Sequence, residues 1–332
     1  MNLGGLWEPV SDPILEVRNL QTHFRRRGLP PIIAVDGISY DLKPGEMMAL
    51  VGESGSGKTI SILSLVRLNP PTSSIVDGAV LWRGHDILRL SNKEIVRIRG
   101  KEIAMIFQDP LSSLNPILTV GKQISESFEI HQGLSRSESW RESERVLGQV
   151  AIPDVKSKMN SYPCQLSGGM RQRVMVAIAL SCNPKLLLAD EPTTSLDATT
   201  QVQLLELMAE ANREARRATI LVTHDLGIVA RYADRVQIMY AGRIVESAKC
   251  EDLYASPLHP YTEALLKAVP RLDRYGHYKL NPIEGNPPRL DRLGSGCAFQ
   301  PRCKRATEKC KHERPPLKNI APERFVACWQ DV

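Results

Sequence analysis

The sequence predicts an α/β fold built on a mostly parallel sheet, with a helical insertion and a cysteine-rich C-terminal extension. Short apolar runs alternate with helical patterns of about ten or more residues, which is typical of parallel strands joined by helices. One of these runs leads directly into a glycine-rich loop. From Tyr254 the composition shifts towards Pro, Arg and Cys, so we expect a boundary between residues 12–254 and 255–332.

In the first half of the chain, β-branched and aromatic residues predict strands, with turns at Pro and Gly. We expect strands at 14–24, 32–42, 47–51, 78–82 and 103–107, and a helix at 60–68. Residues 119–158 carry longer helical patterns rich in Glu, Ser and Arg. They predict a helical subdomain over about residues 109–182, inserted in the α/β core.

The strand and helix alternation returns after this insertion. We expect helices at 167–182, 199–217 and 226–232, and strands at 186–189, 219–223, 236–240 and 243–245. Open parallel sheets bind their ligands at the carboxyl ends of the strands, so polar residues that follow these strands are the candidates for a site.

Composition bounds the function only loosely. The 332 residues are 42% hydrophobic and carry a formal charge of +6, spread along the chain. This charge is compatible with a nucleotide, a nucleic acid, an anionic membrane or only a solvated basic surface. No apolar run approaches the ~20 residues that cross a bilayer, and the first residues lack the basic and apolar regions of a signal peptide. We therefore expect a cytoplasmic protein.

The glycine-rich loop has the pattern Gly-x-x-x-x-Gly-Lys-[Ser/Thr] between a buried strand and a helix, which is the context of a phosphate-binding P-loop. Its backbone amides would surround the phosphates of ATP, Lys58 would reach the β- and γ-phosphates, and the Thr59 hydroxyl would ligate Mg²⁺. The expected nucleotide-binding residues of this loop are Gly52, Ser54, Gly55, Ser56, Gly57, Lys58 and Thr59.

Two carboxylates end the apolar strand Leu186-Leu-Leu-Ala, where they can divide the chemistry of hydrolysis. Asp190 would hold Mg²⁺ through water or through Thr59. Glu191 would act as the general base on the attacking water, a role usually worth ~10²–10⁴ in rate. Alone, this pattern is also a common acidic strand end, and only its combination with the P-loop points to a nucleoside triphosphatase.

The segment Leu166-Ser167-Gly168-Gly169-Met170 begins a predicted helix. Here the sequence resembles the signature of the ATP-binding cassette (ABC) family. The resemblance implies that Ser167, Gly168 and Gly169 contact the γ-phosphate of ATP bound to an opposite subunit. Ser before Gly-Gly is also good N-capping chemistry, and both roles use the same free amides.

Other motifs follow in the order of that family. Gln108 resembles the residue that links Mg²⁺ and the water to the transmembrane subunits, and His224 resembles the switch residue that bonds the γ-phosphate. The segment Ser195-Leu196-Asp197 resembles the loop that communicates between two sites, with Asp197 beside the nucleotide.

Phe24 is the candidate for the aromatic ring that stacks on adenine, with His23 as the alternative. Taken together, these matches imply a P-loop ABC ATPase nucleotide-binding domain. Such a domain has a RecA-like core, an antiparallel β subdomain and an α-helical subdomain.

Two further segments resemble the oligopeptide and dipeptide permease branch of the family: residues 107–116, and the run that begins Ser256-Pro-Leu-His-Pro-Tyr. The resemblance implies ATP hydrolysis that drives import of di- and oligopeptides at the cytoplasmic face of the membrane. The implied partners are two transmembrane permease subunits, a second ATPase that is either a homologue or another copy, and an extracytoplasmic substrate-binding protein. No nucleic acid is implied.

Three alternatives stay open at this point. One is a soluble ABC ATPase in DNA repair or translation, although no coiled-coil insertion or tandem cassette is visible. A second is an importer of nickel or another small solute. A third is a cassette that does not hydrolyse ATP, which the presence of Lys58, Asp190, Glu191 and His224 disfavours.

Four cysteines crowd the last part of the sequence, namely Cys297, Cys303, Cys310 and Cys328. In a cytosolic chain such a set favours a metal site over disulfides. A similar set is associated with an iron–sulfur cluster in peptide permease ATPases, so the resemblance implies a 4Fe-4S cluster. Zinc is the second interpretation and reduced structural thiols the third.

Overall fold

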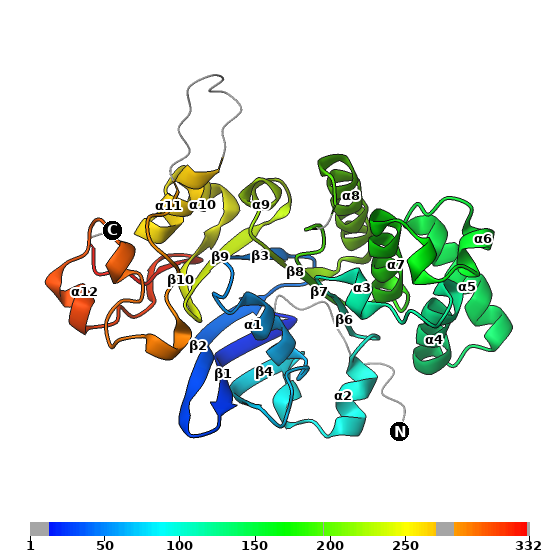
Figure 1. Ribbon diagram of the computed structural model, residues 1–332, viewed down its shortest axis with the longest axis horizontal. Helices are drawn as coiled ribbons and strands as arrows, with labels where there is room; N and C mark the ends of the chain where they lie inside the picture. The colour runs from blue at the N-terminus through cyan, green and yellow to red at the C-terminus, as the bar shows by residue number, and fades with distance from the viewer. Residues whose placement is uncertain (1–12, 195, 270–281, 331–332) are drawn as a thin grey trace, which may run out of the picture.

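A computed structural model describes residues 13–194, 196–269 and 282–330, and within these residues the chain forms two β-sheets (Figure 1). The larger sheet has eight strands in the order β11-β12-β10-β9-β3-β8-β7-β6. Their bounds are Lys318–Ala321, Arg324–Val326, Arg243–Lys249, Arg235–Tyr240, Met47–Val51, Ala218–Thr223, Leu186–Asp190 and Ile103–Ile106. Strands β9, β3, β8, β7 and β6 are parallel, as the sequence predicts.

The smaller sheet is antiparallel, in the order β2-β1-β4-β5. Its strands are Leu29–Leu42, Leu15–Arg26, Ser74–Trp82 and His85–Asp86. The predicted second strand, 32–42, begins earlier in the structure, because Pro30 and Pro31 also belong to β2. Strand β2 lies at the edge of its sheet, where a proline without an N–H group is tolerated.

Helix α1 (Lys58–Leu65) lies between the two sheets. Its buried side chains Ile62 and Leu65 belong to one apolar core with Leu20 of β1 and Leu50 of β3. Helix α1 is therefore held by packing against both sheets, and the P-loop at its start is held with it.

Helices α7, α8 and α9 follow the predicted order, whereas α10, α11 and α12 were not predicted. Helices α3 to α7 gather at one end of the molecule in Figure 1. The helix bounds are α2 Asn92–Ile98, α3 Pro110–Ser113, α4 Val120–Gln132, α5 Arg136–Gln149, α6 Val155–Met159, α7 Gly168–Leu180, α8 Ala198–Ala215, α9 Leu226–Tyr232, α10 Cys250–Ala255, α11 Pro260–Ala268 and α12 Glu308–His312. Helix α2 was not predicted from the sequence, although Ser91 and Glu94 form a capping box at its start.

The C-terminal extension is joined to the core sheet. Strand β12 pairs with β10, where Val326 lies opposite Glu246 and Phe325 opposite Ser247, and β11 continues the edge. Neither strand was predicted from the sequence. In the described part of the chain, no helix is long and apolar enough to cross a membrane.

Candidate nucleotide-binding site

The P-loop connects β3 to α1. At Gly52 and Gly57, the two glycines that define its motif, a residue with a side chain would clash with its neighbours. A Cβ atom at Gly52 would lie 2.2 Å from the carbonyl oxygen of Met239, and one at Gly57 would lie 2.3 Å from that of Ala34. Gly57 also has a φ of 104°, in the left-handed region that favours glycine. Packing around the loop therefore requires glycine at both positions. The loop leads into the start of α1, where backbone amides can bind an anion.

Lys58 points back into its own loop. Its Nζ donates to the carbonyl oxygens of Gly52 at 2.7 Å and Glu53 at 3.0 Å. Burial lowers the pKa of this ammonium group, while Glu191 and Asp190 oppose the shift. The Ser56 hydroxyl is also buried and has no hydrogen-bond partner among the described residues. The loop therefore holds polar groups that phosphate oxygens can satisfy.

Thr59 and Asp190 meet as the sequence predicts, although they are far apart along the chain. The Thr59 hydroxyl donates to Asp190 Oδ1 at 3.0 Å. Asp190 is 2% exposed, and this burial raises the pKa of its carboxyl group. Both side chains offer oxygen atoms, which Mg²⁺ prefers, and Mg²⁺ at such sites takes only one or two protein oxygens beside phosphates and water.

Glu191 lies at the centre of a polar network at the ends of three parallel strands. Its carboxylate accepts from Gln108 Nε2 at 3.1 Å, after β6, and lies 3.3 Å from His224 Nδ1, after β8. Glu191 itself follows β7 with a φ of 43°, which turns its side chain away from the strand direction. The structure thus brings together Glu191, the predicted base, with Gln108 and His224, which were predicted to contact Mg²⁺ and water and the γ-phosphate.

Sequence reasoning missed one member of this network. The Thr194 hydroxyl donates to Glu191 Oε2 at 2.9 Å. Burial alone would raise the pKa of Glu191, but the bonds from Thr194 and His224 outweigh it and hold the pKa below its usual range. The carboxylate therefore stays ionised at neutral pH, as a general base must. The sequence signal for Thr194 was its hydroxyl group, three residues after Glu191, the proposed base.

The signature residues lie away from the P-loop of their own chain, since α7 and α1 are well separated in Figure 1. Ser167 is exposed and caps α7 by accepting the Met170 N–H at 3.3 Å. Gly168 is exposed beside it. A Cβ atom at Gly169 would meet a methyl group of Thr200 at 3.1 Å.

Asp197 has a local structural role in addition to the predicted one. Its carboxylate accepts from the Thr200 N–H at 3.0 Å and the Thr200 hydroxyl at 2.7 Å, which caps α8. Its neighbour Ser195 lies outside the described residues. The predicted communication between sites is not tested by this geometry.

Three other residues predicted to contact the nucleotide are Phe24, Ser54 and Gly55. Phe24 is half-buried on β1, opposite Ile32 on β2 and Ser74 on β4. Ser54 and Gly55 lie in the P-loop, and Gly55 has a φ of 77°. The contact of Phe24 with adenine remains a prediction.

The four C-terminal cysteines line one small cavity together with Trp329. Burial, and then the neighbouring Cys310, raise the pKa of Cys297 to about 11. Among the described residues, however, no group of three or more His, Cys, Asp or Glu side chains is arranged to hold a metal ion. The predicted iron–sulfur cluster and its zinc alternative are therefore not supported by this geometry.

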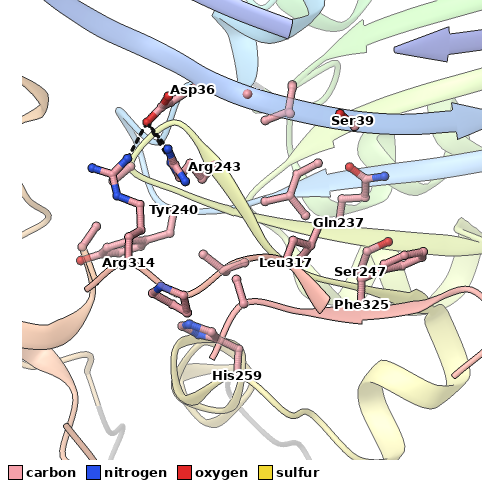
Figure 2. A pocket seen from close by; sticks show the side chains of 18 of the residues that line it. Asp36, Ser39, Gln237, Tyr240, Arg243, Ser247, His259, Arg314, Leu317 and Phe325 are labelled. Carbon is pink, nitrogen blue, oxygen red and sulfur yellow. Dashed lines mark hydrogen bonds and ion pairs between the residues drawn. The ribbon is translucent and has the colours of Figure 1, made fainter. Parts of the chain in front are cut away.

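A cavity of about 400 Å³ lies between β2, β9, β10 and the extension (Figure 2). At its rim, Asp36 accepts from Arg243 at 2.8 Å and from Arg314 at 2.7 Å. Further in, Gln237 and Leu317 line the wall. No residue of the P-loop lines this cavity, so it is separate from the nucleotide site.

Comparisons with known proteins agree with this geometry. Residues 35–194 match the family described as ABC transporter, and residues 245–310 match the C-terminal region of oligopeptide/dipeptide transporters. The oligopeptide transport ATP-binding protein AppD of Bacillus subtilis is 47% identical over 95% of this chain and 96% of its own length. OppD of Salmonella typhimurium, another oligopeptide transport ATP-binding protein, is 46% identical over 96% of this chain and 94% of its own.

The chain belongs to the ATP-binding subunits of ABC transporters. The ABC fold is also that of the dimeric ATP-binding cassette MJ0796, solved bound to ADP and Pi in a post-hydrolysis state. That structure has a TM-score of 0.64 and 28% identity, and the alignment covers 71% of this chain and 98% of MJ0796. This ABC subunit is an ATPase whose hydrolysis is coupled to transport and whose partners are membrane permeases. A role in DNA repair or translation has no support in these relatives.

Proposed function

We propose that this ABC subunit energises the import of di- and oligopeptides through two transmembrane permease subunits, at the cytoplasmic face of the membrane. The observation that carries the proposal is the match of both parts of the chain. The P-loop cassette is followed by a region similar to the C-terminal region of oligopeptide/dipeptide transporters. AppD and OppD, which are named as oligopeptide transport proteins, are similar over nearly the whole chain.

We further propose that ATP is bound between two cassettes. The P-loop of one cassette would hold the phosphates, while Ser167, Gly168 and Gly169 of the other would contact the γ-phosphate. The exposure of Ser167 and Gly168, and the separation of helices α7 and α1 in Figure 1, support this arrangement. The second cassette is a homologous subunit or another copy, and an extracytoplasmic binding protein would deliver the peptide.

Within this site, we assign the chemistry from the observed contacts. Thr59, Asp190 and Gln108 would hold Mg²⁺. Glu191 would take the proton of the attacking water, and His224 would donate to the γ-phosphate. The shared network of Gln108, Glu191 and His224 supports these roles.

The test uses proteoliposomes that contain this chain with the permease subunits recovered with it from native membranes and the matching binding protein. ATP-dependent accumulation of a labelled tripeptide or pentapeptide is expected, and free amino acids and Ni²⁺ should not be taken up. Vesicles with the Glu191→Gln variant serve as the inactive control. Accumulation of Ni²⁺ without peptide would overturn the peptide assignment, and recovery of the chain from native membranes with ribosomes or DNA alone would overturn the transporter role.

The cysteine set has its own test. We propose that Cys297, Cys303, Cys310 and Cys328 hold a 4Fe-4S cluster, with zinc as the alternative. Four thiols are the ligands that such a cluster needs, and these four line one cavity, although in this structure they are not arranged as a metal site. Protein purified without oxygen should be brown and contain iron and acid-labile sulfide, and a quadruple Cys→Ser variant should contain neither. A colourless preparation, with zinc or with no metal, would rule the cluster out.

A further inference from the structure

An arginine of the C-terminal extension reaches the P-loop. Arg302 Nη1 and Nη2 donate to the two carboxylate oxygens of Glu53, at 2.6 Å and 3.0 Å. Glu53 is the second residue of the P-loop, and the two residues are 249 positions apart in the sequence. Such a bidentate pair fixes the orientation of both partners as well as their distance.

The pair is enclosed rather than solvated. The Arg302 side chain is 5% exposed and that of Glu53 is 24% exposed. Arg302 also donates to the Tyr240 hydroxyl at 3.3 Å and to the Glu284 carbonyl at 3.0 Å. The bond to Glu53 raises the pKa of Arg302 above its usual range, so its charge persists at every accessible pH.

A second contact holds the same loop residue. The Glu53 N–H donates to the Tyr261 hydroxyl at 2.9 Å. Tyr261 is fully buried on α11 and packs against Tyr240 and Phe299, with ring centroids 4.5 Å and 5.4 Å away. This aromatic cluster packs the end of β9 against the extension. Tyr261 and Arg302 therefore bond Glu53 from well-packed positions.

Glu53 is also bonded to the residue that meets the phosphates, since its carbonyl oxygen accepts from Lys58 Nζ at 3.0 Å. The conformation of Glu53 thus sets where that carbonyl lies and how the first half of the loop presents its amides. A displaced Glu53 would shift both, and phosphate binding depends on these groups being placed in advance.

We propose that Arg302 is a positioning residue for ATP binding, by which the C-terminal extension holds the first half of the P-loop in its phosphate-binding conformation. The extension is then part of the support of the nucleotide site. The proposal concerns ATP binding by this chain and does not depend on which solute is transported.

The experiment measures the Kd of a ribose-labelled fluorescent ATP analogue on the purified full-length chain. Arg302→Met should raise the Kd roughly two- to thirty-fold, the range found for residues that act on a site through others. Arg302→Lys keeps the charge but not the bidentate geometry, so it should recover part of the affinity. Lys304→Met is the matched control, because Lys304 lies two residues away in an exposed pair with Glu284 and should leave the Kd unchanged.

Two readouts separate positioning from a general loss of stability. In the assembled transporter, Arg302→Met should raise the KM for ATP while kcat changes less than the KM does. In a Glu53→Gln background, Arg302→Met should add little further loss, because the pair is already broken. The Tm without nucleotide is recorded for each variant so that unfolded protein is not counted as weak binding.

Three results would overturn the proposal. The first is a wild-type Kd for folded Arg302→Met protein. The second is a full additional loss in the Glu53→Gln background. The third is an equal loss for Lys304→Met. If Arg302→Met does not fold, the Kd values of Arg302→Lys and Glu53→Gln decide the question, since both retain polar side chains. Failure of peptide uptake would leave these measurements unaffected.

Discussion

Replacing Glu191 by Gln should lower the rate of ATP hydrolysis by about 10²–10⁴ while ATP still binds. The amide cannot accept the proton of the attacking water, yet it has nearly the same shape. The contacts to Gln108 and Thr194 can be remade with a turned amide, because each partner can both donate and accept. Phosphate release should be measured at saturating ATP, and the state of association by size-exclusion chromatography. ATP should accumulate in closed dimers.

The matched control is Glu210→Gln, which removes an exposed carboxylate from α8 outside the polar network. It should hydrolyse ATP at the wild-type rate and form no long-lived dimers. Hydrolysis at the wild-type rate by the Glu191→Gln variant would remove Glu191 from the general-base role and leave Asp190 as the nearest candidate.

Replacing Lys58 by Met should lower hydrolysis by about 10²–10³, the usual cost of removing one group that stabilises charge at the transition state. The same change should not destabilise the protein without nucleotide. Lys58 is 5% exposed, and burial lowers its pKa, so the folded loop disfavours its charged form. Among the described residues, the change removes the hydrogen bonds from Nζ to the carbonyl oxygens of Gly52 and Glu53, and removal of the buried ammonium group offsets this loss.

Two measurements on one preparation distinguish the loss of hydrolysis from a loss of stability. Phosphate release reports the loss of activity, and thermal unfolding without nucleotide reports stability. Lys93→Met, on the exposed side of α2, is the control for removing a lysine and should change neither. A large fall in Tm for Lys58→Met would show that the lysine supports the fold of the loop rather than the phosphates.

Much of the nucleotide site could be predicted because its residues are bound to local patterns. The P-loop glycines, Asp190 and Glu191 each follow an apolar strand, and parallel strands bring their carboxyl ends to one edge. Gln108 and His224 follow β6 and β8, the strands on either side of β7, and so reach the same edge. The resemblance to the ABC family supplied the roles of Gln108 and His224, and their positions after strands agree with this edge.

The extension could not be predicted in the same way. All four residues of β11 are exposed, so no apolar alternation marks the strand. Strand β12 joins the core sheet by pairing with β10, about 80 residues earlier in the sequence. The contact between Arg302 and Glu53 likewise depends on the completed fold, because nothing near either residue in the sequence indicates the other.

The inward bonds of Lys58 bear on how tightly ATP can bind. The carbonyl oxygens of Gly52 and Glu53 take two of the three donors of the ammonium group, so ATP binding compares this set of hydrogen bonds with one that includes a phosphate oxygen. The measured affinity is the difference between the two sets. A loop that already satisfies most of its lysine donors therefore gains less from a phosphate contact than a loop with a free ammonium group would.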